Sequence, residues 1–375
     1  MFHDSPATPQ PLRQGLHIWL AGILRFPVPL KLLTGSMDVR ETLAALIGAH
    51  MGREDVPLPG RGSTAQRWSL FARIAAEHGA VAIKLFEAHA DALAILAELA
   101  DATPPRDTRW AVWAAEPPDA RVRASACADT AAARAAAHEL AAAIGVTDVR
   151  PVVLDGRKAW CSGARGVSHA LITCEDRDHG AWLAAIDLNG AGVTITDEGW
   201  HAVGMADTGS GDVLLDNCPA LLIGPPRGYV ERPGFWHGGA GIAACWYGAV
   251  LPMAHAVRQA VQRRGDAHAA AHLGAIHGDL HAAAALLRET AAWIDAHPDA
   301  DAFVPAMRAR TTVEAVVQRV LHRAGSVLGA GPLCRDARLA ALFADLPVFL
   351  RQSHAERDLA ALGMALREID TDITL

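Results

Sequence analysis

Two short segments carry the side chains that are best suited to hold a planar cofactor. In Lys158–Ala164 (KAWCSGA), an indole, a hydroxyl and several small residues follow an apolar run. In the other segment, Trp113 precedes Ala115 and Glu116, again at the end of an apolar run. Turns at two strand ends can stack an indole on a flat ring and direct backbone N–H groups at its edge. Trp160 can also be interpreted as an ordinary core residue, since tryptophan is usually well buried.

Composition and charge exclude several other classes of site. The formal net charge is -7 and the isoelectric point is about 6.2. No basic block is present, so nucleic-acid binding has no electrostatic support. The six cysteines are spread along the chain without a C-x-x-C pair, which indicates a reduced, intracellular protein. No cluster of zinc ligands is present, so we expect no metal site.

The first part of the chain bears on membrane insertion. Residues Met1–Gln10 lack a basic region that leads into an apolar core. The segment Leu16–Leu33 is fairly apolar, but charged residues and prolines interrupt it: His17, Arg25, Pro27, Pro29 and Lys31. Because a spanning helix needs about 20 mostly apolar residues, we expect neither a signal peptide nor a membrane span, and we expect a cytoplasmic protein.

The elements that must position these residues are predicted in three regions, beginning with a helical one at residues 1–108. Apolar residues recur at spacings of three and four over residues 66–100, which is typical of helices. Gly79 is expected to separate two helices, and the prolines after Thr103 end the run.

Residues 109–233 read as a β-domain, because short runs rich in valine, isoleucine, leucine and tryptophan alternate with turn residues. Five to eight such strands indicate a barrel or a sandwich. Residues 129–144 are an exception, since their alanine-rich pattern predicts a helix. The clearest predicted strands are Trp110–Ala115, Pro151–Leu154, Ala170–Cys174, Ala181–Leu188, Val193–Thr196 and Val213–Leu215.

Residues 234–375 are predicted to be helical again. Four stretches have helical periodicity and helix length, and short connections between long helices favour a bundle of about four. They are Ile242–Gln262, Ala267–His297, Val313–Leu328 and Arg335–Leu366. The predicted fold class is therefore α+β, with an N-terminal helical domain, a middle β-barrel or sandwich and a C-terminal four-helix bundle.

An α-β-α chain with these strand ends resembles the acyl-CoA dehydrogenase family over about residues 66–365. Trp113–Pro117 is similar to the family's Thr-Glu-Pro segment, and Lys158–Ala164 to its Lys-x-Trp segment. Three further stretches match in the same order: Val203–Val213 before the bundle, Arg263-Arg264 inside it, and Cys334–Arg338 before the last helix.

The resemblance implies FAD as cofactor and gives roles to several residues. Trp160 is expected against the isoalloxazine, and Ser162 near its N5 atom, where a donor would stabilise charge on the reduced ring. Backbone N–H groups of the segment with Trp113, Ala115 and Glu116 are expected at the pyrimidine, although Ala115 replaces the usual threonine. Arg264 stands where the family has an arginine that reaches the pyrophosphate of a neighbouring subunit, a role that suits a guanidinium. A solvated helix residue is an equally good interpretation of Arg264.

The catalytic base is where the sequence departs from the family. The usual glutamate position is Ala344, and the alternative one falls near Gly238. Asp345 and His237 each lie one residue away and are the candidate substitutes, because the reaction needs a base near the α-carbon. Asp345 can also be interpreted as a helix cap, and His237 as a packed or solvent-facing histidine.

Three functions follow from the resemblance. The first is α,β-dehydrogenation of an acyl-CoA or related thioester, with hydride transfer to flavin N5 and an electron-transfer flavoprotein or other acceptor. The second is a flavin-dependent monooxygenase of the same fold, which does not need the glutamate. The third is a non-catalytic flavin-fold binding protein. We also expect a homo-oligomer, dimer or tetramer, because Arg264 would serve a neighbour and because the face of Ile242, Trp246 and Val250 needs burial.

Overall fold

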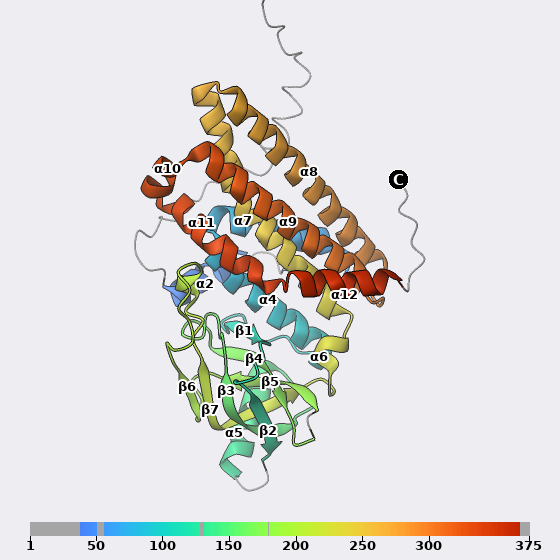
Figure 1. The fold of residues 1–375 in the computed structure, drawn as a ribbon. Coiled ribbons are helices and arrows are strands. Elements are labelled where there is room, and N and C mark those ends of the chain that lie inside the picture. The colour runs from blue at the N-terminus through green and yellow to red at the C-terminus, as the bar shows by residue number, and fades with distance from the viewer. Residues whose placement is uncertain (1–37, 51–55, 128–130, 179, 368–375) are drawn as a thin grey trace, which may run out of the picture. The chain divides into compact units, whose positions relative to one another are not determined.

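The computed structural model describes residues 38–50, 56–127, 131–178 and 180–367. These residues belong to one unit, Ser36–Leu375. The segments Met1–Gln10 and Leu16–Leu33 lie outside the described residues. In Figure 1 the strands gather at one end of the unit and α8 and α9 at the other, with α4 between them.

The helices before the strands follow the predicted periodicity. The first described helix is α2 (Val39–His50), followed by α3 (Thr64–His78) and α4 (Ala80–Ala100). Gly79 separates α3 from α4 with a φ of 92°, a conformation that glycine adopts without strain. Two of the predicted helical faces, one on each helix, are therefore confirmed, as is the break between them.

The strands close into a small barrel, as the sequence predicted. Neighbouring strands run β4-β2-β3-β7-β5 and return to β4, while β1 is added to β4 and β6 to β7. The ring closes between β2 and β4 through one residue pair, Arg123 with Glu175. The strands are β1 (Trp110–Trp113), β2 (Val122–Ala126), β3 (Pro151–Lys158), β4 (His169–Glu175), β5 (Ala181–Asp187), β6 (Val193–Ile195) and β7 (Val213–Ile223).

Of two further elements of the barrel, the helix α5 was predicted from the sequence and the strand β2 was not. The alanine-rich helix is present as α5 (Ala131–Ile144), between β2 and β3. Strand β2 was not among the named strands, because its sequence VRASA has a single β-branched residue, Val122, and no aromatic residue. It becomes a strand through pairing with β3 over its full length.

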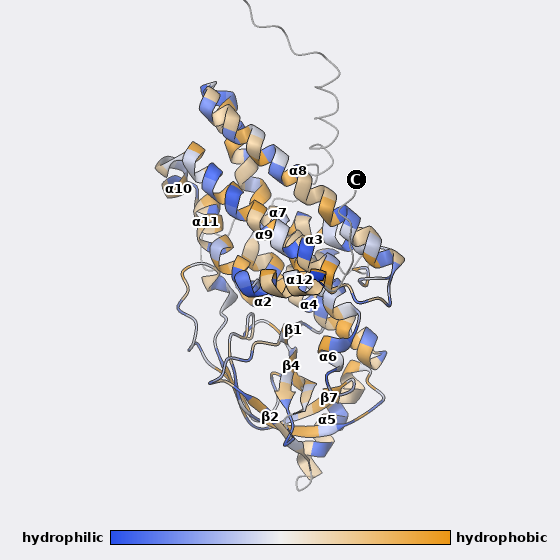
Figure 2. Ribbon diagram, turned by 45° about the vertical axis from the view of Figure 1, so that its right-hand side comes forward, coloured by the Kyte–Doolittle hydropathy of each residue, from blue (hydrophilic) through white to orange (hydrophobic). Residues whose placement is uncertain are grey.

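Long helices follow the barrel. A short helix, α6 (Gly228–Glu231), precedes α7 (Gly234–Arg264), α8 (Ala267–Ala296) and α9 (Phe303–Leu328). Polar and apolar residues alternate along α8, as expected for a helix with one solvated face (Figure 2). Helix α3 packs against both α7 and α8, so helices before and after the barrel share one hydrophobic core. The domain boundaries at 108/109 and 233/234 stay predictions.

The last predicted helix is wrong in one respect. Residues 335–366 form not one helix but α11 (Ala337–Phe349), a 3-10 turn η2 (Leu350–Gln352) and α12 (Glu356–Arg367), after the short helix α10 (Ala330–Arg335). The charged run His354–Asp358, which the sequence placed inside this last helix, therefore spans the break and the first turn of α12. The break is stabilised by Asp358, which accepts a hydrogen bond from the backbone of His354 (2.9 Å), and Ala355 has a φ of 48°.

Helix α7 forms the centre of the helical core. Gly248 is required at its crossing with α3, because a Cβ there would overlap the Ala72 carbonyl. Ile242, Trp246 and Val250 are buried within the chain, so the expectation that this face is buried in an oligomer is wrong.

Helix α7 is long and apolar enough to cross a membrane, but 72% of its apolar window is buried inside the protein, which makes it weak evidence for a span.

His89 joins α4 to the barrel and yields a prediction about pH. Its buried ring accepts a hydrogen bond at Nδ1 from the backbone of Trp110 (3.1 Å), and burial, followed by the charge of Arg109, lowers its pKa to about 4. In the unfolded chain His89 takes up a proton near pH 6.5, whereas in the folded chain it stays neutral until the pH falls to about 4. Between pH 7 and 4 this group should therefore remove at most about 3 kcal/mol from the free energy of unfolding.

His89→Asn keeps an acceptor in place of Nδ1 and should lose less stability than the wild type over that pH range. Urea denaturation at several pH values measures the difference, with His138→Asn on the exposed face of α5 as the matched control. Parallel pH profiles for the wild type and His89→Asn would contradict this account.

Candidate functional site

A turn at the end of β3 presents Trp160 to solvent. The indole is 50% exposed, so Trp160 is not a core residue. Its backbone has a φ of 57°, in the left-handed region that bulky residues rarely adopt. A strained backbone at an exposed aromatic residue is a feature of functional sites, since folding stability alone does not favour it.

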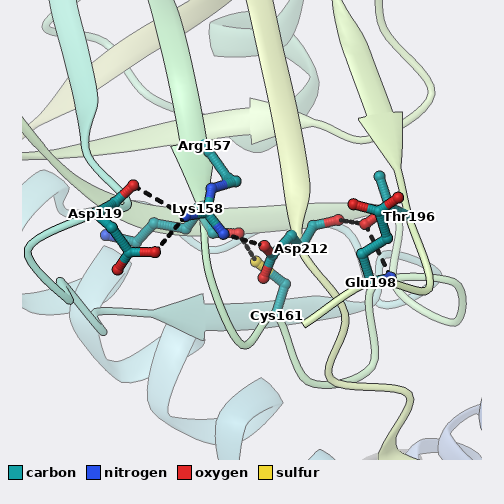
Figure 3. A network of polar contacts seen from close by, with 7 residues as sticks. All are labelled: Asp119, Arg157, Lys158, Cys161, Thr196, Glu198 and Asp212. Carbon is teal, nitrogen blue, oxygen red and sulfur yellow. Dashed lines mark hydrogen bonds and ion pairs between the residues drawn. The ribbon is translucent and has the colours of Figure 1, made fainter. Parts of the chain in front are cut away.

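The turn is held rigidly by the loop before β7. The Cys161 amide donates to the Gly211 carbonyl (2.9 Å), and the Gly163 amide donates to that of Thr208 (2.8 Å). On the strand side, Arg157 lies between Asp119 and Asp212 and donates to both carboxylates, at 2.7 and 2.5 Å (Figure 3). The two segments therefore form one unit that fixes the direction of Trp160.

Three hydroxyl groups connect Ser162 to the interior. Ser162 Oγ lies 2.7 Å from Ser210 Oγ, and Ser210 Oγ lies 2.7 Å from Thr208 Oγ1. Thr208 Oγ1 donates to the Met205 carbonyl at 2.7 Å. Ser210 and Thr208 are buried, whereas Ser162 is partly exposed. No role was predicted for Thr208, and Ser210 was noted only within a matching stretch, because side chains that meet through a turn leave no spacing pattern.

Asp345 belongs to the same assembly. Its Oδ1 accepts a hydrogen bond from the Met205 amide at 2.6 Å. Burial raises its pKa, the hydrogen bond from Met205 partly opposes this shift, and the charge of Asp207 adds a smaller rise. Gly204 lets α11 approach this loop, because a Cβ there would overlap the Ala344 carbonyl. Asp345 lies inside α11 and does not cap it; Asp336 caps that helix by accepting from the amides of Arg338 and Leu339.

The end of β1 meets the turn from the other side. Trp113 is buried and its indole N–H donates to the Ser162 carbonyl (3.1 Å). Glu116 is held by Thr173, whose hydroxyl donates to Glu116 Oε1 (2.5 Å) and accepts from the buried Lys158 amine (2.7 Å). In the part of the chain that the structure describes, the backbone amides of Ala115 and Glu116 have no hydrogen-bond acceptor. Two N–H groups are thus free beside the turn.

An open hollow of about 350 Å³ lies next to Glu116. Arg121, Arg123 and Arg157 line it, together with Asp119 and Asp155. Arg157 is engaged by two carboxylates, and Arg121 forms an ion pair with Glu116 (3.1 Å). Arg123 is mostly exposed and lies 3.6 Å from Glu175. Guanidinium groups around a hollow of this kind can bind a phosphate.

His237 and Arg264 lie elsewhere. The buried ring of His237 packs against Gly60 in the loop before α3, and burial lowers its pKa. It is therefore a packed histidine, and the structure does not bring it to the turn. Arg264 is exposed at the end of α7, where it donates to the Val327 carbonyl of α9 (3.2 Å). Its contact with a neighbour's cofactor stays a prediction.

Sequence reasoning missed a cluster of charges inside the helical core. Arg67 and Arg310 are held mainly by backbone carbonyls, those of Pro57, Gly239 and Gln352. Burial raises the pKa of Glu87 on α4, and Asp91 Oδ1 on the same helix is buried without a partner among the described residues. Glu87 and Asp91 are one turn apart on α4, a spacing that could have signalled the cluster.

The described residues contain no group of three or more histidine, cysteine, aspartate or glutamate side chains that could hold a metal ion. All six cysteines are free; five are buried and Cys334 is exposed.

Comparisons with known proteins bear on the fold. No family model matches the chain, and no curated protein matches it. Solved structures do match over most of its length. A dibenzothiophene monooxygenase from Paenibacillus sp. A11-2, in complex with FMN and indole, has a TM-score of 0.67 and 16% identity, and the match covers 86% of each chain.

Two further structures agree with it. A nitrososynthase from Micromonospora carbonacea var. africana has a TM-score of 0.68 at 18% identity, covering 97% of this chain and 98% of the other. Butyryl-CoA dehydrogenase from Megasphaera elsdenii also has a TM-score of 0.68, at 14% identity, covering 88% and 89%. The chain has the acyl-CoA dehydrogenase fold. The resemblance read from the sequence is thereby confirmed as to this fold, which by itself does not decide the reaction.

The left-handed backbone of Trp160 gives a prediction within this fold. Trp160→Gly should be more stable than Trp160→Ala by about 1 kcal/mol, because only glycine adopts a φ of 57° without strain. Thermal and urea unfolding of the two variants measure this difference. At a position without strain, such as exposed Leu359 in α12, the alanine variant should instead be the more stable of the pair. Equal stability of the two Trp160 variants would contradict the geometry.

Proposed function

We propose that the protein is a flavin-dependent oxidoreductase whose flavin ring lies on Trp160. The exposed, strained indole beside Ser162 is the observation that carries this proposal. Similar structures support it, since the Paenibacillus protein was solved with FMN. A bound flavin would supply two-electron chemistry that no side chain of the chain provides.

The residues present fit such a ring. Trp160 offers a flat face for stacking, and the free amides of Ala115 and Glu116 offer donors for ring carbonyl oxygens. Lys158 and Thr173 hold Glu116, so these donors are fixed before binding. We assign the flavin phosphate to the nearby hollow lined by Arg121 and Arg123, because guanidinium groups bind phosphate. These residues support a flavin at the turn.

The mononucleotide and the dinucleotide are both compatible with this site. The resemblance implied FAD, with Arg264 at the pyrophosphate of a neighbouring subunit, and one N–H of the Arg264 guanidinium donates to the Val327 carbonyl. Titrations with both flavins decide between them.

Among the possible reactions, we favour oxygenation by a reduced flavin over acyl-CoA dehydrogenation. Dehydrogenation needs a carboxylate base, and Asp345 already binds the Met205 amide. A monooxygenase needs no such base: reduced flavin provides two electrons, one atom of O₂ enters the substrate and the other leaves as water. Dehydrogenation of a thioester, with an electron-transfer flavoprotein as acceptor, is the second candidate, because Asp345 retains a second oxygen and a raised pKa.

An anaerobic absorbance spectrum tests the proposal. The purified protein is loaded with FMN or FAD and treated first with a panel of acyl-CoAs and then with dithionite. We expect no bleaching by any acyl-CoA, bleaching by dithionite and rapid recovery of colour in air. Bleaching by an acyl-CoA would establish the dehydrogenase instead, and a protein that takes up neither flavin would leave the non-catalytic interpretation.

Asp345 supplies a second test, which separates a supporting residue from a base. Asp345→Asn keeps an oxygen for the Met205 amide, so its activity and stability should stay near those of the wild type. Asp345→Ala leaves that half-buried amide without a partner and should cost about 1–3 kcal/mol of stability. If Asp345→Asn loses activity by several orders of magnitude while remaining as stable as the wild type, Asp345 is the base.

We also propose that the chain forms a dimer or tetramer, on the ground that Arg264 corresponds to an arginine that serves a neighbour's cofactor in the family it resembles. Light scattering that shows only a monomer would refute this.

A further inference from the structure

The three hydroxyl groups behind the turn can be assigned a direction. A carbonyl oxygen only accepts, so the single hydroxyl proton of Thr208 is given to the Met205 carbonyl (2.7 Å). Thr208 Oγ1 must then accept from Ser210 at 2.7 Å. The Ser210 proton is thereby used, so Ser162 is the donor in its 2.7 Å contact with Ser210. Every proton of this hydroxyl chain points inward.

Burial keeps this arrangement in place. Ser210 and Thr208 are buried, so no solvent water competes for their protons. The Met205 carbonyl that ends the chain is fixed as well, because the Met205 amide donates to Asp345 (2.6 Å). A buried hydroxyl without an acceptor would cost free energy, which disfavours reversal of the chain.

The consequence appears at the exposed end. Ser162 Oγ donates its only proton to Ser210. Toward a ligand on Trp160 it therefore offers only lone pairs, which accept hydrogen bonds. It is an acceptor and not the donor that the sequence led us to expect near N5. The central ring of an oxidised flavin offers an acceptor nitrogen at N5, whereas the reduced ring offers an N–H donor there.

We infer that Ser210 and Thr208 are positioning residues that make the site select reduced over oxidised flavin through the orientation of the Ser162 hydroxyl. This inference rests on the proposed function and adds to it the redox state that the site receives.

Binding of the two redox forms to the full chain is the test, and it needs no turnover. Oxidised FMN and dithionite-reduced FMN are titrated anaerobically against the protein, followed by equilibrium dialysis. Reduced FMN gains a hydrogen bond from its N5–H to Ser162 Oγ, whereas the N5 acceptor of oxidised FMN faces another acceptor there. The affinity for reduced FMN should therefore exceed that for oxidised FMN on the order of tenfold. The midpoint potential of bound FMN should then lie above that of free FMN by about 30 mV for a two-electron couple.

Thr208→Val tests the orientation of the Ser162 hydroxyl without changing any residue that contacts the flavin. Valine removes the acceptor for Ser210, whose proton must then turn to Ser162, and the Ser162 proton is released toward the ligand. The preference should fall by about tenfold or reverse, although no atom that touches flavin has changed. Thr208→Ser retains the hydroxyl and should keep the wild-type ratio, as should Ser326→Ala on the exposed face of α9.

Ser210→Ala is the second variant, in case Thr208→Val does not fold. It leaves Ser162 free to rotate, and the ratio of the two affinities should approach one. Equal binding of both redox forms by the wild type, or an unchanged ratio in both Thr208→Val and Ser210→Ala, would overturn the inference while flavin binding itself stands. Failure to bind either form would overturn the proposed function, and the inference with it.

Discussion

The contact between Asp345 and the Met205 amide is the interaction on which the site depends. It connects α11, a helix near the end of the chain, to the loop that precedes β7. The same loop bonds to the turn of Trp160 at two backbone positions. The loop that holds the turn of Trp160 is therefore itself held by a contact between residues 140 positions apart in the chain, and folding of the C-terminal region completes the site.

The periodicity of the sequence was sufficient for the order of most helices and strands but not for these contacts. Apolar residues at spacings of three and four located α3, α4, α8 and α9, because these spacings mark the buried face of an amphipathic helix. Strand β2 and the break before α12 depend on pairing and on the capping of His354 by Asp358, neither of which leaves a periodic signal. Local patterns predict local structure, and β2 shows how tertiary pairing can override a weak propensity.

The residues of the candidate site fall into the same two classes. Trp160 and Ser162 were recognised because they are close in sequence and belong to a short motif. Thr208, Ser210 and the amide partner of Asp345 lie far from it in sequence, and only the fold brings them together. Asp345 was selected for its carboxylate, and the structure shows that one oxygen of this carboxylate accepts from the Met205 amide, while its role as a base stays a prediction.

The single residue pair that closes the barrel has a further consequence. Arg123 with Glu175 is a weak seam between β2 and β4, and the two strand ends of the site lie on opposite sides of it. The buried amine of Lys158 crosses from β3 to the Thr173 carbonyl of β4 (2.8 Å), so it acts as a tether over this seam. The two strand ends are therefore joined by side-chain contacts, the Lys158 amine with Thr173 and the Trp113 indole with the Ser162 carbonyl, while the backbone of β2 and β4 pairs at one residue only.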